Sequence, residues 1–466
     1  MNGNILASEE RFWGETDSKT IQNAVDYAKK TGANSVTVPR FNPRTGKNVW
    51  IIEEAIILPS EMEIVLDNAH LRQEDKMMDN IFRNFLDVAT EGHTLSQQSR
   101  RIVIRGVGNA LLDGGTHNGL TEKTSKLEGM PPASRNCMIL FYNIRDFLIE
   151  GLELRDHRYW AIHLVHAERG RLSDLRFMGE CHCPNQDAID LRIGCSNIII
   201  ERIVGQTGDD VVALSAINKN SEKYLYHVSD HESDIHDIII RDVIATSVEC
   251  AVIALRNNNG SKMHDITIDN IHSNDNYALQ DGKRYPDYPT YKIRPFDIVR
   301  IRESNEPYAL LRIGQPGYLS GPDSRNAVLG EVYNIHATNL HTFTGCMILA
   351  NVTLENCYFG NLYAGNDVDY IFTTKELRTE RVYGADLKNV VFENVFYKNE
   401  DNEFGVAFDL IQKDQEFTAE NVFVRNAFLG NCKKPFFVNY GSLSYSGVYG
   451  THVEKESGSV TPGEKE

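Results

Sequence analysis

The sequence has no long apolar run, and its first residues do not have the pattern of a secretion signal. Its first residues, MNGNILASEERFWGE, have neither a basic start nor an apolar segment, and no later stretch is long enough to cross a bilayer. We therefore expect a cytoplasmic protein that does not bind membranes. Positive charge is also scarce, because the 466 residues carry a formal net charge of −17. This charge argues against nucleic acid as a partner, and a polyanionic substrate would need a local basic patch.

Cysteine is sparse, with eight residues in the whole chain. Without a secretion signal, we expect these cysteines to be reduced thiols. Cys181, His182 and Cys183 lie close together and invite a metal-site interpretation. A zinc site needs a second pair of ligands at suitable spacing, which the sequence does not supply. We therefore expect neither a metal nor a cofactor.

Helical periodicity is confined to the N-terminal region, over residues 17–31. Asp17 and Ser18 could cap this helix, and Gly32 ends it. One face carries Ile21, Ala24, Val25 and Ala28. A strand, SVTVP, follows. An amphipathic helix before a series of strands suits a cap over the end of a solenoid, which would otherwise expose apolar side chains and strand edges.

The rest of the chain repeats a short β-branched segment, often introduced by Asn, Asp or His. Examples are RIVIRGV (101–107), SNIIIERI (196–203), HDITIDNI (264–271) and NVVFENVF (389–396). Alternation within each segment buries every second residue, and several segments start about 24 to 28 residues apart. This pattern predicts an all-β fold, a single right-handed parallel β-helix with an N-terminal capping helix. A propeller is the alternative, but its repeats would be longer and more uniform.

The repeats also predict the extent of the domain. We expect residues 1–450 to form one β-helix domain, capped at about 17–31, and residues 451–466 to form a polar, flexible tail. Asparagines at equivalent places in successive coils could form an internal amide ladder. That would give a structural use to Asn197, Asn351 and Asn389.

Three acidic residues on two successive segments indicate chemistry. Asp187 lies in NQDAIDLRIGCSNIIIERI, and Asp209 and Asp210 lie in VGQTGDDVVAL about one repeat later. In a parallel β-helix these segments would lie on adjacent coils, about 4.8 Å apart. Like charges this close raise one another's pKa, so one carboxyl can act as an acid while another acts as a base. Hydrolysis of a glycosidic bond requires that pairing, although an acidic pair after Gly could also form a turn or a calcium site.

The order of these motifs resembles glycoside hydrolase family 28, the polygalacturonases and their relatives. NQDAID (185–190) is similar to the family's Asn-Thr-Asp-Gly-Ile-Asp, and the triplet at 208–210 matches its Gly-Asp-Asp. Upstream, LLDGGTHNG (111–119) resembles the family's Asp-Gly-x-Gly turn, and residues 158–177 are similar to the coil before the first motif. The resemblance covers about residues 100 to 215.

The resemblance implies a role for each acid. Asp209 would protonate the leaving oxygen, and Asp187 and Asp210 would orient and deprotonate the attacking water. The family inverts the anomeric centre, which needs room for water between the acid and the base. Asn185 would support the site by hydrogen bonding. Asp190 could face the other way and serve a turn or a ladder.

The chain departs from the family pattern in two later motifs. The family's Gly-His-Gly coil corresponds here to TSVECAVIALR (246–256), which has no histidine, and its Arg-Ile-Lys has only a partial match, RIG at Arg312. Glu249 or Arg256 could occupy the vacated space, and His231 could reach over from an insertion. These departures bear on the identity of the sugar more than on the hydrolytic chemistry.

A basic and aromatic segment, residues 281–303, could replace the missing cations. Its candidate substrate-binding residues are Lys283, Arg284, Lys292 and Arg294, interleaved with tyrosines. Tyrosines can stack on sugar faces, and arginine can hold a carboxylate bidentately. The alternative is a solvated loop whose charge is balanced by its own acids.

The aromatic and histidine residues before the first acidic segment each have two interpretations. For Trp160, packing against the core is favoured over stacking on a sugar. His157 is a better candidate than His163 for contact with substrate, and His117 could line the cleft.

Three functional hypotheses follow from these observations. The first is an inverting glycoside hydrolase that cleaves α-linked bonds of a pectin-type or related oligosaccharide, with insertions that favour exo action. The second is a polysaccharide lyase on the same fold, with residues 281–303 supplying the cation and the base that elimination needs. The third is a carbohydrate-binding β-helix without catalysis. All three imply an oligosaccharide or polysaccharide partner, and none determines the oligomeric state.

Overall fold

The computed structural model describes residues 5–75, 77, 79–87, 91–115, 137–179, 185–217, 228–247, 250–258, 261–273, 309–314, 331–374, 385–398, 405–411, 417–432 and 434–462. The chain divides into two compact units. Unit 1 comprises the described residues up to Asp209 together with 228–233, and unit 2 comprises 210–217 and the described residues from Asp234 onward. The expectation that residues 1–450 form one domain stays a prediction.

Unit 1 begins with a helix that has the predicted bounds. Helix α1 (Asp17–Thr31) ends at Gly32, whose φ of 74° places it in the left-handed region that glycine adopts readily. The N-cap is Thr16, whose side chain accepts a hydrogen bond from the amide of Lys19 (3.0 Å). The suggested caps Asp17 and Ser18 were therefore wrong by one or two positions. Both instead hold neighbouring segments, since Asp17 pairs with Arg44 and Ser18 bonds Glu53.

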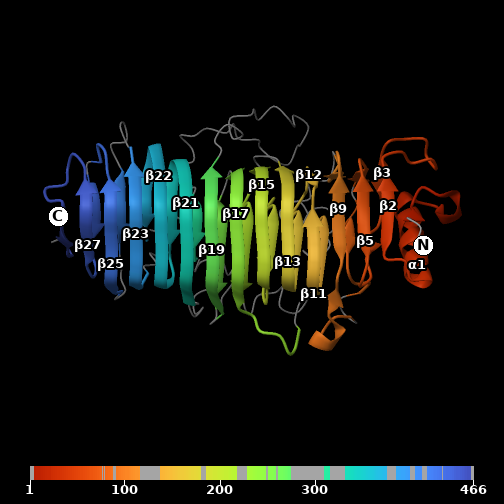
Figure 1. Cartoon of the computed structure of the whole chain (residues 1–466), viewed down its shortest axis with the longest axis horizontal. Helices are drawn as coiled ribbons and strands as arrows, with labels where there is room; N and C mark the ends of the chain where they lie inside the picture. Colours follow the sequence, from red (N-terminus) through yellow and green to blue (C-terminus); the bar gives the residue numbers. More distant parts are fainter. Residues whose placement is uncertain are drawn as a thin grey trace. The chain divides into compact units, whose positions relative to one another are not determined.

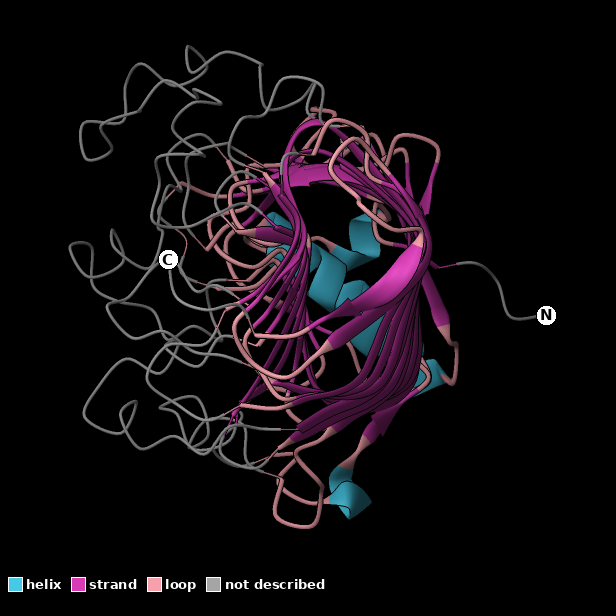
Figure 2. Ribbon diagram, turned by 90° about the vertical axis from the view of Figure 1, so that its left-hand side faces the viewer, coloured by secondary structure: helices cyan, strands magenta, loops and turns pink. Residues whose placement is uncertain are grey.

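The apolar face of α1 packs against the first strands of unit 1, which confirms the capping helix. Ile21, Ala24, Val25 and Ala28 are fully buried, and the helix contacts β2 (Ser35–Pro39), β3 (Trp50–Ile52) and β4 (Ile56–Ile57). In Figure 2 strands (magenta) make up most of the described chain, and helices (cyan) are few. Within the described residues α1 is the only α-helix.

The rest of unit 1 consists of parallel strands, and each long strand pairs in register with the strand that follows it one coil later. Figure 1 shows β2, β5, β9, β11, β13 and β15 side by side in chain order. Ile139 of β11 (Ile139–Glu150) pairs with Ile162 of β13 (Ile162–Met178). Gly170 of β13 then pairs with Ile198 of β15 (Ser196–Thr207). The other strands of unit 1 are β1 (Ile5–Leu6), β5 (Glu63–Asp67), β6 (His70–Gln73), β7 (Phe82–Arg83), β8 (Ser99–Arg100), β9 (Val103–Val107), β10 (Leu111–Asp113), β12 (Glu153–Arg155) and β14 (Ile189–Arg192), with 3-10 helices η1 (Glu10–Phe12) and η2 (Leu95–Gln97).

The long strands of unit 1 turn corners at residues with positive φ. In β11 these are Asn143 (φ 47°) and Asp146 (φ 57°). Asn and Asp visit the left-handed region more readily than other non-glycine residues, because their short polar side chains bond locally. The Asn and Asp residues that introduce the repeated segments therefore mark the corners of the coils.

Unit 2 is also built from parallel strands that pair from one coil to the next. In Figure 1 its strands β17, β19, β21, β22, β23, β25 and β27 lie side by side. Parallel registers join them, as in Ile235 to Met263 and Leu387 to Ala419. The strands are β16 (Val212–Ile217), β17 (Ile235–Ser247), β18 (Ala251–Asn258), β19 (Lys262–Ser273), β20 (Ala309–Ile313), β21 (Glu331–Ala350), β22 (Thr353–Thr373), β23 (Leu387–Tyr397), β24 (Val406–Leu410), β25 (Ala419–Phe428), β26 (Lys434–Val438), β27 (Leu443–Tyr449) and β28 (Ser457–Val460).

An amide ladder does form in unit 2, but it is exposed rather than internal. Asn389 donates to Asn356 (2.9 Å) and accepts from Asn421 (3.0 Å) on the outside of the corner. Asn351 is buried and donates to a backbone carbonyl (2.9 Å), and Asn197 is exposed. The expectation of one internal ladder was therefore wrong, because the left-handed corner conformation directs these amides outward.

The C-terminal segment contains one further strand. In the predicted tail, β28 pairs antiparallel with β27, for example Ser457 with Ser446. Its exposed side chains match the polar composition seen in the sequence. The flexibility of residues 451–466 stays a prediction.

Candidate functional site

The first predicted acid of unit 1, Asp187, lies just before β14 and is 4 % exposed. Its backbone carbonyl accepts a hydrogen bond from the amide of Ala161 (2.9 Å), at the start of the preceding coil's strand. Asp187 therefore follows a turn, and this backbone hydrogen bond to the preceding coil holds it in place. Asn185, two residues earlier, has a φ of 60°, which fits the tight turn that leads into this segment.

The second acid of unit 1, Asp209, is bound to the first acidic segment. The amide of Asn185 donates to Oδ2 of Asp209 (3.0 Å), and Oγ1 of Thr207 donates to its backbone carbonyl (2.5 Å). Asp209 is half-buried, whereas Asp187 is buried. The support predicted for Asn185 thus comes from its backbone. A partly exposed carboxyl held in this way can reach an atom outside the protein.

His157 braces the same segment from the preceding coil. Nε2 of His157 lies 3.3 Å from the carbonyl of Gln186, and Nε2 of Gln186 donates to the carbonyl of His157 (2.5 Å). Burial lowers the pKa of His157 to about 4, so the ring is neutral near pH 7. Because the ring is 1 % exposed, this conformation gives it a bracing role. Contact between His157 and substrate stays a prediction.

The third acid, Asp210, belongs to unit 2 and follows Asp209 directly in the chain. Its Oδ1 accepts from the amide of Ala251 (3.0 Å), and its Oδ2 forms an ion pair with Arg256. Both partners are buried, and Nη2 of Arg256 also lies 3.3 Å from Sγ of Cys250. Arg256 therefore places positive charge on a carboxylate predicted to act on water. Its predicted contact with substrate stays untested.

Arg312 is the other predicted binding residue described in unit 2. It lies in β20 in register with Ala254 on one side and Leu349 on the other. Arg312 is fully buried. Because Arg256 follows Ala254 by two residues, the two arginines occupy the same face of neighbouring strands.

His231 lies at another place in unit 1. Its Nε2 is 2.9 Å from Oε1 of Glu168, its Nδ1 is 2.9 Å from the carbonyl of Glu232, and its ring packs on His166 (4.6 Å between centroids). These contacts attach residues 228–233 to a corner of β13. The predicted role of His231 in substrate binding stays a prediction.

Several candidates lie outside the described residues. They are Glu249, Lys283, Arg284, Lys292, Arg294, His117, Cys181, His182 and Cys183. Within the part of the chain that the structure describes, no helix is both long and apolar enough to span a bilayer.

A buried cluster of unit 1 was not predicted. Arg192, at the end of β14, places Cζ 3.8 Å from the ring centroid of Trp160 and Nη2 3.6 Å from Oδ1 of Asp190. His163 packs edge-on against Trp160 (4.7 Å) and lies 3.5 Å from Sγ of Cys137. Trp160 is 1 % exposed, which confirms packing as its role. The spacing of Asp190 and Arg192 in one strand could have indicated a shared face.

Electrostatics in this cluster favour a neutral imidazole beside a charged guanidinium. Burial, with the charge of Arg192, lowers the pKa of His163 well below its ordinary range. His163 is also in parallel register with Asp190 on the next coil. Asp190 therefore contacts this cluster, and the turn or ladder role that the sequence suggested stays a prediction.

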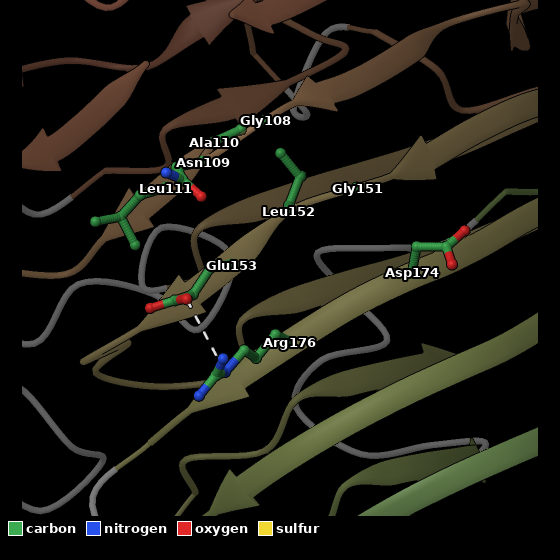
Figure 3. Close-up of a pocket in the computed structure, with 9 residues that line it drawn as sticks. All are labelled: Gly108, Asn109, Ala110, Leu111, Gly151, Leu152, Glu153, Asp174 and Arg176. Carbon is green, nitrogen blue, oxygen red and sulfur yellow. Dashed lines mark ion pairs between the residues drawn. The ribbon is translucent and has the colours of Figure 1, made fainter. Parts of the chain in front are cut away.

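A separate pocket of unit 1 lies over three successive corners, as Figure 3 shows. Its volume is about 480 Å³. The lining residues are Gly108, Asn109, Ala110, Leu111, Gly151, Leu152, Glu153, Asp174 and Arg176. Arg176 and Glu153 form an ion pair across it (4.0 Å). None of the catalytic or substrate-binding residues predicted from the sequence lines this pocket.

The fold is shared with several solved structures. The exopolygalacturonase from Thermotoga maritima has a TM-score of 0.55 at 12 % identity, over 99 % of this chain and 94 % of that one. The A-module of the mannuronan C-5 epimerase AlgE4 from Azotobacter vinelandii has a TM-score of 0.57 at 10 % identity, over 95 % and 100 %. The polygalacturonase from Erwinia carotovora has a TM-score of 0.50 at 13 % identity, over 88 % and 91 %.

No protein-family model and no curated protein matches the chain in sequence. At 10 to 13 % identity the structural likeness concerns the fold, which hydrolases and an epimerase share. The chain has the right-handed parallel β-helix fold of the polygalacturonases and of related β-helix proteins.

Proposed function

We propose that this protein is an inverting glycoside hydrolase that cleaves α-linked bonds of a pectin-type or related oligosaccharide. The observation that carries the proposal is the 3.0 Å hydrogen bond from the amide of Asn185 to Asp209. This bond joins the two acidic segments that the sequence pairs as catalytic motifs. In the proposed mechanism Asp209 protonates the leaving oxygen, while Asp187 and Asp210 activate water.

The exposure of the acids supports this division of roles. A general acid has to reach a bridging oxygen of the substrate, and of the two predicted acids in unit 1 Asp209 is half-buried whereas Asp187 is buried. Asp210 is buried in unit 2 and forms an ion pair with Arg256, which holds its carboxylate in place. Exo action and a cytoplasmic location stay predictions of the sequence.

The test replaces Asp209 by Asn and assays a panel of α-linked uronides and galactosides. We expect a loss of about a hundredfold to ten-thousandfold in kcat, because the amide cannot donate the proton that the leaving group needs. Asp146→Asn is the matched control, since Asp146 is a half-buried acid of unit 1 that pairs with Arg169. Sugar release that is unchanged in Asp209→Asn would rule out this assignment.

The same assay separates the competing functions. Inversion predicts that NMR of the first product detects the β-anomer from an α-linked substrate. An unsaturated product that absorbs in the ultraviolet would identify a lyase instead. Binding without turnover of any glycan, unaffected by the three aspartates, would identify a carbohydrate-binding protein.

A further inference from the structure

We propose that the pocket beside Glu153 and Arg176 in unit 1 is a second, non-catalytic binding site, and that its ligand is a neutral sugar. The pocket has a volume of about 480 Å³, within the roughly 300–1,000 Å³ of small-molecule sites. None of the three acids predicted to be catalytic lines it. The site would bind a sugar without cleaving it, so the inference does not depend on the proposed hydrolase.

The pocket arises where the corners of successive coils differ in length. Between the positions where β9 pairs with β11 and those where β10 pairs with β12, the first coil has residues 106–110, and the next has only Gly151 and Leu152. In the coil after that, Asp174 and Leu175 take these places. The longer corner therefore lies beside two shorter ones, and residues of all three coils line the pocket.

Hydrogen bonds hold the longer corner in place. The amide of Asn109 donates to Oδ1 of Asn68 (3.1 Å), and the amide of Asn68 donates to the carbonyl of Val107 (2.9 Å). Gly108 has a φ of 66°, and a Cβ at this position would lie 2.4 Å from Oδ1 of Asn68, so the corner requires glycine. These contacts fix one wall of the pocket before any ligand binds, which lowers the cost of binding.

Glu153 and Arg176 lie side by side on neighbouring strands. Their backbones are in parallel register, and the amide of Arg176 donates to the carbonyl of Leu152 (2.9 Å). In Figure 3 a dashed line joins the two side chains across the space between their strands. Nε of Arg176 lies 4.0 Å from Oε2 of Glu153, beyond the roughly 2.7–2.9 Å of a charge-assisted hydrogen bond. The two side chains are 52 % and 36 % exposed, so a ligand can reach both.

The gap between these two side chains matches a hydroxyl group. A hydroxyl donates one hydrogen bond and accepts others, so it can donate to Glu153 and accept from Arg176 at the same time. Among the described residues, Glu153 is the only polar partner of the Arg176 side chain. The remaining N–H groups of its planar fork can therefore serve a neighbouring hydroxyl of the same ligand.

The charges around the pocket favour a neutral ligand. Glu153, Asp174 and Arg176 all line it, and both carboxylate oxygens of Asp174 are already bonded to Arg202 (2.7 Å each). A carboxylate or a phosphate would be repelled by Glu153, and a cation would be repelled by Arg176. A neutral polyol avoids both penalties.

Apolar side chains complete the match to a sugar ring. Ala110 and Leu152 are buried, Leu111 is half-buried, and all three line the pocket. A pyranose carries hydroxyls around its edge and C–H groups on its faces, so it can contact the polar and the apolar walls together. Apolar walls with a few well-placed polar groups are typical of small-molecule sites.

The test measures the binding of free monosaccharides, which have no glycosidic bond to cleave. Galactose, glucose and mannose are titrated into wild type and Arg176→Met, and saturation-transfer NMR records binding. We expect at least one sugar to bind wild type with millimolar affinity, as is usual for ligands of about a dozen non-hydrogen atoms. In Arg176→Met its affinity should fall about five- to twentyfold, because the hydroxyls lose a charged donor.

Arg169→Met is the matched control. Its side chain is 51 % exposed, pairs with Asp146 (2.8 Å) and does not line the pocket, so sugar binding should stay unchanged. Equal affinity in wild type and Arg176→Met, or no binding of any of the three sugars in the millimolar range, overturns the proposal. Failure of the proposed hydrolase shows separately, through Asp209→Asn.

Glu153→Gln tests the preference for a neutral ligand. Glutamine keeps an acceptor and removes the negative charge that repels anions. Galacturonate, the carboxylate counterpart of galactose, should bind wild type more weakly than galactose does, and this difference should shrink or reverse in Glu153→Gln. A wild type that prefers galacturonate would overturn the assignment of a neutral ligand.

Crystals soaked in the sugar that binds most tightly locate the site. We expect density for one pyranose in this pocket, with hydroxyl contacts to both Glu153 and Arg176. A sugar bound only at other places, with none in this pocket, contradicts the proposal.

Discussion

At the residue scale, buried carboxylates in each unit have cationic partners. In unit 1, Glu201 is fully buried and pairs with Arg171 and with Arg202 (2.8 Å). In unit 2, Asp210 pairs with Arg256. An unpaired charge in a protein interior is costly, so such partners are required wherever a carboxylate is covered. Asp210, one of the three acids predicted to be catalytic, follows this rule, which makes Arg256 part of the candidate site.

Asp113 of unit 1 provides a test of pH dependence. Burial raises its pKa, but hydrogen bonds from His70 (2.8 Å), the amide of Gly115 (2.8 Å) and Arg155 (2.9 Å) outweigh burial and lower the pKa from 3.8 to about 2. A depressed folded-state pKa means that the carboxylate stabilises the fold above about pH 4. This contribution, about 2 kcal/mol, is lost as the pH falls toward 2.

Asp113→Asn should therefore lower the free energy of unfolding by about 2 kcal/mol at pH 6, with a difference from wild type that shrinks toward pH 2. Urea unfolding at a series of pH values measures this difference. Asp75→Asn, at a more exposed acid of unit 1, should change stability by about 0.5 kcal/mol or less. A difference for Asp113→Asn that stays constant from pH 6 to 2 would contradict the prediction.

At the element scale, the coils of unit 2 are joined at their corners as well as along their strands. A second ladder of exposed amides, besides the one through Asn389, runs through Asn361, Asn394 and Asn426, in β22, β23 and β25. Two residues after each asparagine an aromatic side chain stacks on its neighbour, as Tyr363 does on Phe396 (5.1 Å). The sequence correctly predicted the strands and the recurrence of asparagine at equivalent places in successive coils. It did not predict that the amides point outward, since this depends on the corner's backbone conformation.

Replacement of Asn394 tests the ladder and the corner separately. Asn394 has a φ of 55°, donates to Asn361 (3.0 Å) and accepts from Asn426 (2.6 Å). Asn394→Gly loses the bonds but tolerates the φ, whereas Asn394→Ala also bears the left-handed strain of about 1–2 kcal/mol. We expect stabilities in the order Asn, Gly, Ala in urea unfolding. An alanine variant as stable as the glycine variant would show that the corner is not strained.

At the scale of the whole molecule, net charge is the property that bears most on how a charged substrate approaches the protein. The formal net charge of −17 repels an anionic oligosaccharide at long range. Salt weakens this repulsion, because charges farther apart than about 10 Å are largely screened at 0.1 M salt.

We therefore expect salt to assist the turnover of anionic substrates. Between about 10 mM and 150 mM salt, kcat/KM for an oligogalacturonide should rise roughly two- to fivefold, because screening weakens the long-range repulsion. Neutral oligosaccharides should show no dependence, and they serve as the control in the same kinetic series. A decrease with salt for the charged substrate would mean that a basic surface steers it.

The sequence predicted part of the candidate site, and there is a physical reason why it did not predict the rest. The acidic motifs at 185–190 and 208–210 were recognisable because their residues are contiguous. The bond between Asn185 and Asp209, and the stacking of Arg192 on Trp160, join different coils. Such contacts depend on how many residues each turn contains, which a repeated pattern does not specify.

By itself the sequence determined the capping helix at residues 17–31 and the succession of parallel strands, because periods of 3.6 and 2 residues are local properties. Only the tertiary structure decided which side chains meet between coils. Parallel stacking brings together residues about one repeat apart, and a change of register by one residue reverses the face of every side chain. That is why the acids could be predicted as a group, whereas the partners of Asp210 and of Arg192 had to be found in the folded chain.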